Sequence, residues 1–251
     1  MNKEEQLLVK RFRELSYQAS LKGYHTFTDF LNLNEINLFY SNTKEFASVN
    51  YSFWGGHKEA ERKILSFHTE ENIILEEFNI LMIEIRPVHA KFADQLTHRD
   101  FLGALIHLGI DRSKLGDILI KDNIGYVFTD YVIGDYIIQN LTKIKHTHVV
   151  CSSCSLDEIN IEPSYKEIRG TISSNRLDSV VSLALNTSRS SITGLITGGK
   201  VYVNGRLVES NSYVLKDDDI VSVRGHGKFV FKGITNQTKK GRLSATILKY
   251  I

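Results

Sequence analysis

The sequence predicts an α+β protein in three parts, and three observations lead to this prediction. Apolar residues follow the helical spacing in some stretches and the alternating spacing of strands in others. The middle third shows strand, helix, strand, strand, helix and strand patterns in that order. The last third carries an excess of positive charge. We therefore expect a mixed N-terminal domain (residues 1–78), a β-α-β-β-α-β middle domain (79–165) and a basic C-terminal domain (170–251).

The composition is that of a globular protein without a membrane segment. Its 251 residues are 42% hydrophobic and 24% charged, which is ordinary for this class. No run of 18 apolar residues occurs, and the start, MNKEEQLLVKRF, lacks the apolar segment of a signal peptide. Two cysteines give no disulfide framework, and two prolines give no Pro-rich linker. We expect a cytoplasmic protein that makes no membrane contact.

The charge is divided unevenly along the chain. The net charge is +2, but residues 170–251 hold 12 Lys/Arg and 5 Asp/Glu, a net of +7, and residues 1–169 have a net of −5. A basic domain on an acidic body favours a polyanion as partner. A solvated basic surface would give the same totals, so charge alone leaves both interpretations open.

The N-terminal part mixes helices with one strand. Its spacing predicts helices over residues 4–22 and 34–47, a strand at Val49–Trp54, and a helix from His57 to about Phe67. Gly55-Gly56 lies between that strand and that helix. A glycine pair there could hold phosphate, but a tight turn is the preferred interpretation because no phosphate-loop pattern accompanies it.

The middle part gives the most regular pattern. In chain order, the elements are the strand Asn79–Arg86, a helix from Thr97 to Leu108, the strands Asp117–Lys121 and Gly125–Thr129, the helix Tyr131–Ile144 and the strand Thr147–Ser153. This is the order of the ferredoxin-like fold, which RRM domains share. Tyr126 and Phe128 would lie on the strand where RRM aromatics stack bases. The RRM motif is not met, and burial of both rings in the core is the preferred interpretation.

The C-terminal part begins after a short polar linker from Pro163 to Ser173. Two short helices follow: the first has apolar residues at helical spacing from Leu177 to Leu185, and Thr187 or Ser188 can cap the second. Gly198-Gly199 ends the second helix. The remaining elements are a hairpin around Asn204-Gly205, strands at Ile220–Arg224 and Lys228–Lys232, and a strand or short tail over Thr235–Ile251.

The residues of this part resemble a known RNA-binding domain. RLD (176–178), SRS (188–190), GGKVYVNG (198–205) and DDDIVSVRG (217–225) together resemble the alpha-L (S-four-type) domain. With FWGGHKEAERK (53–63), HRDFLGALIHLGIDRSKLGDILI (98–120) and a KKGR segment near the end, the chain is similar to the YlmH family of bacterial RNA-binding proteins. The resemblance implies an N-terminal domain, an RRM-like middle domain and a terminal alpha-L domain.

The resemblance also implies a function. It implies binding to the large ribosomal subunit and peptidyl-tRNA in rescue or quality control of stalled translation, with no catalytic activity and no small-molecule substrate. The expected partners are therefore structured RNA (rRNA and tRNA) and the large ribosomal subunit. Two alternatives stay open: an RNA-modifying enzyme of the pseudouridine-synthase type, with a site in the first 78 residues, and a cell-division-linked adaptor that carries RNA as a ligand.

The expected RNA-binding residues lie at the ends of helices and strands in the C-terminal part. Arg176 and Arg189 would hold phosphates at the two helix starts, and the other residues would extend the basic face. The full set is Arg176, Ser188, Arg189, Ser190, Lys200, Arg224, Lys228, Lys239, Lys240 and Arg242.

Neither catalysis nor a metal is expected. Arg176-Leu177-Asp178 matches only part of a pseudouridine-synthase motif, and Asp178 is better interpreted as an acid that stabilises a helix start. His146, His148, Cys151 and Cys154 have zinc-ligand chemistry. Strand alternation would place the two cysteines on opposite faces, however, and no second CxxC occurs. We expect no catalytic residue, no metal site and no cofactor.

Overall fold

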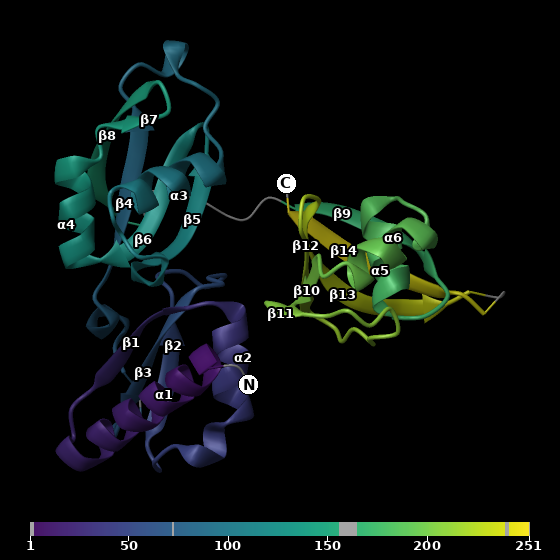
Figure 1. The fold of residues 1–251 in the computed structure, drawn as a ribbon, viewed down its shortest axis with the longest axis horizontal. Coiled ribbons are helices and arrows are strands. Elements are labelled where there is room, and N and C mark those ends of the chain that lie inside the picture. Colours follow the sequence, from purple (N-terminus) through teal and green to yellow (C-terminus); the bar gives the residue numbers. More distant parts are fainter. Residues whose placement is uncertain (1–2, 72, 156–164, 239–240, 251) are drawn as a thin grey trace. The chain divides into compact units, whose positions relative to one another are not determined.

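The computed structural model of the protein describes residues 3–71, 73–155, 165–238 and 241–250. The chain divides into two compact units between residues 161 and 162, and Figure 1 gives their elements. Among the helices in these ranges, none is long and apolar enough to cross a membrane.

The first unit begins with two helices packed on a small antiparallel sheet. Its elements are α1 (Lys3–Lys22), β1 (Thr26–Leu31), α2 (Leu33–Ser41), β2 (Asn50–Trp54) and β3 (Lys63–His68), and the strand order is β1-β3-β2. The apolar face of α1 buries Phe12, Leu15 and Ala19 in a cluster with Phe39 and Phe67. The helix predicted over residues 4–22 is confirmed, and its buried apolar residues recur at helical spacing.

The helix expected over residues 57–67 is wrong. The charged run after Gly55-Gly56 forms a turn, and the chain then enters β3, the central strand of the sheet. Leu65 packs on the α1 and α2 side, whereas Ile64 packs on the other side. A strand that is buried on both faces has no alternating pattern, so its sequence does not distinguish it from a buried helix.

The second layer of this unit contains a five-stranded antiparallel sheet. Its elements are β4 (Ile80–Pro87), α3 (His98–His107), β5 (Leu115–Lys121), β6 (Ile124–Asp130), α4 (Tyr131–Asn140), β7 (Lys143–Ile144) and β8 (Thr147–Cys154), in the strand order β5-β6-β4-β8-β7. Short 3-10 turns lie at Thr43–Glu45, Leu75–Phe78, Ala90–Phe92 and Arg112–Lys114. The predicted order of strands and helices is confirmed, with β7 as an addition.

The second helix of this layer is shorter than expected. It ends at Asn140, and Leu141 already has an extended backbone, with φ −85° and ψ 101°. Ile144, expected in the helix, instead lies in β7 and is buried among the residues under α3 and α4. Burying Ile144 through a hairpin with β8 therefore overrides the local helical pattern.

The two faces of the five-stranded sheet are both covered. Helices α3 and α4 share one face (Figure 1), where their apolar residues pack with Ile83 and Val127. On the other face, Tyr126 and Phe128 are 5% and 1% exposed and share one cluster with Phe30 and Ile64 of the N-terminal sheet. Their interpretation as core residues is confirmed. The surface on which RRM domains stack bases is therefore closed here.

The glycine pair serves this packing. Gly56 has φ +94°, and a Cβ there would lie 2.3 Å from the ring of Phe128. A Cβ on Gly55 would lie 2.3 Å from the carbonyl oxygen of Arg62. The pair forms a tight turn under the aromatic layer, as preferred from the sequence.

The two cysteines of β8 point to opposite faces. Cys151 packs in the cluster under α3 and α4, and burial raises the pKa of its thiol to about 11. Cys154 packs on the side of Phe128. Within the described ranges, no group of three or more His, Cys, Asp or Glu side chains is placed to hold a metal ion.

The second unit is a six-stranded antiparallel sheet with two helices. Its elements are β9 (Tyr165–Ile172), α5 (Leu177–Leu185), α6 (Arg189–Thr197), β10 (Val201–Val203), β11 (Arg206–Leu207), β12 (Asp219–Val223), β13 (Gly227–Gln237) and β14 (Leu243–Tyr250), in the strand order β11-β10-β12-β13-β14-β9. The linker expected from Pro163 to Ser173 is wrong, because residues 165–172 form β9 and pair along β14.

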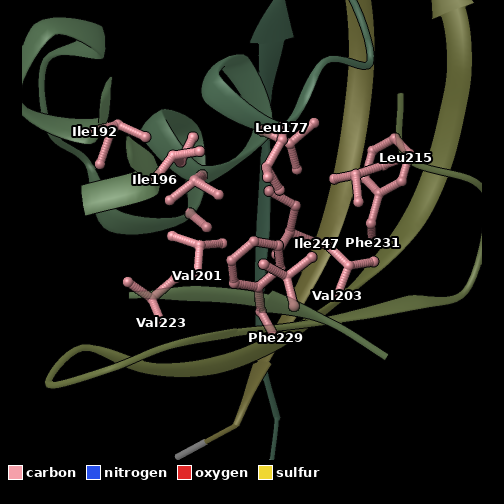
Figure 2. Packing of buried hydrophobic residues seen from close by; sticks show 14 of the residues in the cluster. Leu177, Ile192, Ile196, Val201, Val203, Leu215, Val223, Phe229, Phe231 and Ile247 are labelled. Carbon is pink, nitrogen blue, oxygen red and sulfur yellow. The ribbon is translucent and has the colours of Figure 1, made fainter. Parts of the chain in front are cut away.

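Both helices pack on one face of this sheet. Figure 2 shows Leu177 of α5 and Ile196 of α6 directed toward Val201 and Phe229, all of them at most 1% exposed. The Asn204-Gly205 turn has positive φ at both residues, 48° and 77°, which is the expected two-residue hairpin. The Asn204 side-chain oxygen accepts a hydrogen bond from the Ile220 backbone, 2.9 Å, and ties this hairpin to β12.

Candidate nucleic-acid interface

A buried carboxylate joins the starts of α5 and α6. Asp178 is 5% exposed, and its two oxygens lie 3.3 Å from Nε of Arg176 and 2.5 Å from Nη2 of Arg189. The two arginine side chains remain 42% and 48% exposed. The group carries a net charge of +1, and its cationic edges face solvent while its carboxylate is inside.

Local structure explains why these side chains meet. Arg176 is the N-cap of α5 and pairs with Val214 in an isolated bridge, while the Leu177 amide donates to the Tyr213 carbonyl at 2.8 Å. Arg189 is the first residue of α6. The start of α5 is thus anchored by the 210–215 loop, and the short α5–α6 connection places the second arginine against Asp178.

The arginine of α6 also reaches the end of β9. Its Nη1 donates to the hydroxyl of Ser173 at 3.3 Å, next to a surface pocket of about 520 Å³. Arg189 and Arg242 both line this pocket, together with Ser182 and Thr187. Arg242 donates to the Thr171 carbonyl at 2.9 Å and is exposed. Two cations and several hydroxyls around one opening match the donors that bind phosphate oxygens.

The serines at this site differ in their roles. The Ser188 hydroxyl oxygen caps α6 by accepting from the Ser191 amide at 3.3 Å, so one of its two lone pairs serves the helix. Ser190 is exposed, and its hydroxyl lies 2.9 Å from that of Ser188. Lys239 and Lys240, also expected to bind RNA, lie outside the described residues.

Two of the expected basic residues lie on the opposite face of the sheet. Val201 and Phe229 point toward the helices, so strand alternation directs Tyr202 and Lys228 to the other side. Arg224, in the turn after β12, lies over the ring of Tyr202 and therefore on that same side. Lys200 is exposed immediately before β10, and its carbonyl accepts from the Arg224 amide at 2.8 Å. The expectation that these residues extend the helix-start face is therefore wrong for Arg224 and Lys228, which belong to a separate surface.

Sequence reasoning also missed residues that complete the helix-start site. It interpreted Asp178 only as an acid in the first turn of α5, Thr187 only as a possible helix cap, and gave no role to Ser173. The RLD and SRS runs contain the signal for this contact, because together they supply its one carboxylate and its two arginines. Their distance apart in the chain hides the contact.

The fold and this basic site define an RNA-binding protein with a C-terminal S4 domain, since residues 175–221 match the family described as "S4 domain". Residues 74–158 match the family described as "Putative RNA-binding domain in YlmH". Over 247 residues the chain is 31% identical to the "Ribosome-associated protein quality control protein P2" of Bacillus subtilis (strain 168), covering 97% of this chain and 92% of that protein. The chain belongs to the YlmH family of RNA-binding proteins.

A solved structure supports the fold. The "Cell division protein ylmH from Streptococcus pneumoniae" matches with a TM-score of 0.52 and 21% sequence identity, covering 64% of this chain and 97% of that one. At this identity the likeness concerns the fold alone.

Proposed function

We propose that this protein binds structured rRNA and tRNA on the ribosome and acts in the quality control of stalled translation. It acts by binding, with no chemical step of its own, and its position on the ribosome is the large subunit beside peptidyl-tRNA. The name of the Bacillus subtilis relative, which describes a ribosome-associated quality control protein, supports this context. The observation that carries the proposal is the pair of exposed arginines held by the buried Asp178.

The physical basis is recognition of the RNA backbone. Arginine side chains and the backbone N–H groups of a helix start both bind phosphate oxygens. Asp178 fixes the two guanidinium groups before RNA arrives, so less side-chain freedom is lost on binding. Backbone contacts of this kind follow the shape of folded RNA more than its sequence. Binding should therefore weaken steeply with salt.

The test is the salt dependence of binding by the full-length protein. Fluorescence anisotropy with tRNA and with a large-subunit rRNA hairpin gives log K against log salt for wild type and Arg189→Ala. Loss of one phosphate contact should flatten the slope by roughly 0.7–0.9. Arg11→Ala, on an exposed arginine of α1, is the matched control and should leave the slope unchanged. An unaltered slope and affinity in the double variant Arg176→Ala/Arg189→Ala would refute the site.

The ribosomal context has its own experiment. Protein from cell extracts is followed through a sucrose gradient, with and without an inhibitor that stalls elongation. We expect the protein in the large-subunit fractions, in greater amount after stalling. Its absence from all ribosomal fractions would refute the proposed context and leave the RNA-binding site standing.

A further inference from the structure

The sheet face opposite α5 and α6 carries a row of tyrosines with basic partners. Tyr202 of β10 pairs with Ser222 of β12, which pairs with Lys228 of β13. The next step of the β13–β14 register brings Lys228 to Tyr250, and Tyr250 pairs with Tyr165 of β9. These five residues, the tyrosine row, cross five neighbouring strands on one face, each of them partly exposed.

The contacts within the tyrosine row are those of cations on aromatic rings. The Lys228 ammonium lies 4.3 Å from the ring centroid of Tyr250, and the Arg224 guanidinium lies 5.9 Å from that of Tyr202. Arg224 also donates to the Tyr202 hydroxyl at 3.3 Å. The rings of Tyr165 and Tyr250 meet edge to face at 4.9 Å. One cation therefore lies at Tyr202 and another at Tyr250, and Tyr165 adds a third ring at the end of the row.

The charge around the tyrosine row is positive in sum. On the same face, Arg169 pairs with Glu167 at 2.8 Å, and Lys232 contacts the carboxylate of Asp218. Each of these two pairs is neutral, and Arg224 and Lys228 add two further positive charges to this face. A face with net positive charge and several aromatic rings complements an anionic chain whose units carry flat bases.

We propose that the tyrosine row is a second RNA-contacting surface, which stacks the bases of an unpaired RNA segment while Arg224 and Lys228 hold its phosphates. An unpaired strand is favoured over a duplex because ring faces can stack only on bases that have left a helix. The row spans about 19 Å across its strands, enough for several nucleotides. The inference uses the RNA-binding nature of the protein but no residue of the helix-start site.

The experiment measures binding of a 12-nucleotide oligouridine to the full-length protein by fluorescence anisotropy. Tyr202→Leu and Tyr250→Leu keep an apolar side chain in the strand but remove the ring, and each should weaken binding about tenfold. Tyr202→Phe and Tyr250→Phe keep the ring and should retain the affinity. Tyr17→Leu, at an exposed tyrosine of α1, is the matched control and should also retain it.

Several results would overturn the tyrosine row as an RNA surface. They are failure of wild type to bind the oligonucleotide, wild-type affinity in the double variant Tyr202→Leu/Tyr250→Leu, and Phe variants as weak as the Leu variants. Arg189→Ala separates the two sites, since it should weaken tRNA binding and leave the oligouridine affinity within about twofold. Loss of oligouridine binding in Arg189→Ala alone would assign both RNAs to the helix-start site.

A second measurement on wild type does not depend on the folding of any variant. Oligouridine that contains 4-thiouridine is photo-crosslinked to the protein, and the modified peptides are identified by mass spectrometry. Crosslinks in the peptides that contain Tyr202 or Tyr250 are expected. Crosslinks confined to the α5 and α6 peptides would overturn the inference and would still agree with the proposed function.

Discussion

At the scale of single residues, one carboxylate organises the basic site. Asp178 contributes a negative charge to a surface that we propose binds an anion, which would weaken binding if charge alone mattered. Its burial and its contacts with two arginines instead make it a positioning residue. Each arginine keeps part of its donor set in solvent, because the guanidinium group presents five N–H donors. Asp178 therefore lowers the electrostatic attraction of this surface for an anion, but it fixes the positions of the two guanidinium groups.

Replacement of this carboxylate separates the two effects. Asp178→Asn raises the net charge by one, yet we expect tRNA affinity to fall about tenfold, the equivalent of about one charge-assisted hydrogen bond. Unfolding free energy should fall by about 1–2 kcal/mol, a modest loss because both arginines can turn to water. Glu209→Gln makes the same charge change at an exposed loop position and should not weaken binding. Tighter binding by Asp178→Asn would contradict the positioning role.

The sequence predicted the role of a residue only where that role depends on residues close to it in the chain. Arg176 and Arg189 could be placed at helix starts because capping and helical spacing are local signals. The bridge through Asp178 could not be predicted, since it joins residues from two helices. Tyr165 could not be included in any surface because the segment that contains it was interpreted as a linker.

At the scale of secondary-structure elements, the start of α3 is stabilised by charge as well as by its cap. Thr97 and Asp100 form a capping box, and the Lys145 ammonium lies 2.7 Å from the Asp100 carboxylate. The hydrogen bonds from Lys145 and Thr97 lower the pKa of Asp100 to about 2. His98, Arg99 and Asp100 are the first three residues of α3, and Asp100 stabilises this helix start.

This lowered pKa predicts an acid dependence of stability. Since the folded-state pKa of Asp100 lies below its ordinary value of 3.8, the ionised group stabilises the fold above about pH 4, and this stabilisation is lost as pH falls toward 2. In urea unfolding, wild type should lose more stability between pH 5 and 2.5 than Asp100→Asn does. Asp135→Asn, at an exposed position of α4, should behave as wild type. Equal acid dependence in wild type and Asp100→Asn would exclude this role.

Burial on both faces does not by itself prevent the prediction of a strand, since β6 is covered on both faces and was predicted. β5 and β6 were placed correctly, and the residues between them, Asp122-Asn123, form the hairpin turn with φ of 51° and 64°. β3 was mistaken for a helix because it is buried between two layers and because its apolar run follows the charged residues 57–63 with no turn signal between them. The end of α4 was placed too late because Ile144 is drawn into a hairpin.

At the scale of the whole molecule, the first unit joins two sheets through one buried aromatic cluster. Phe128 lies at its centre, with the His57 ring at 4.9 Å and Gly56 against its edge. Beside it, Asp117 accepts hydrogen bonds from His57 (3.2 Å) and from the backbone of Arg62 (3.1 Å). Although burial alone would raise the pKa of Asp117, these bonds lower it, so the carboxylate stays ionised and ties the two layers. The N-terminal layer thus closes the RRM-like sheet.

The cluster around Phe128 should therefore determine the stability of the first unit without affecting the RNA sites of the second. Phe128→Ala removes a ring that is 1% exposed, and the unfolding free energy of the first unit should fall by about 3–5 kcal/mol. Trp54, the single tryptophan, packs against this cluster, so its fluorescence reports this unfolding. Phe92→Ala makes the same change where the ring is 84% exposed and should cost less than about 0.5 kcal/mol.

The same pair of variants tests whether stability and binding are separate. Below the unfolding transition of Phe128→Ala, its affinities for tRNA and for oligouridine should match those of wild type, because every residue proposed to bind RNA lies in the second unit. A variant that keeps its folded Trp54 fluorescence but loses affinity would place part of the RNA surface in the first unit. Equal unfolding midpoints for Phe128→Ala and Phe92→Ala would instead contradict the role of the buried cluster.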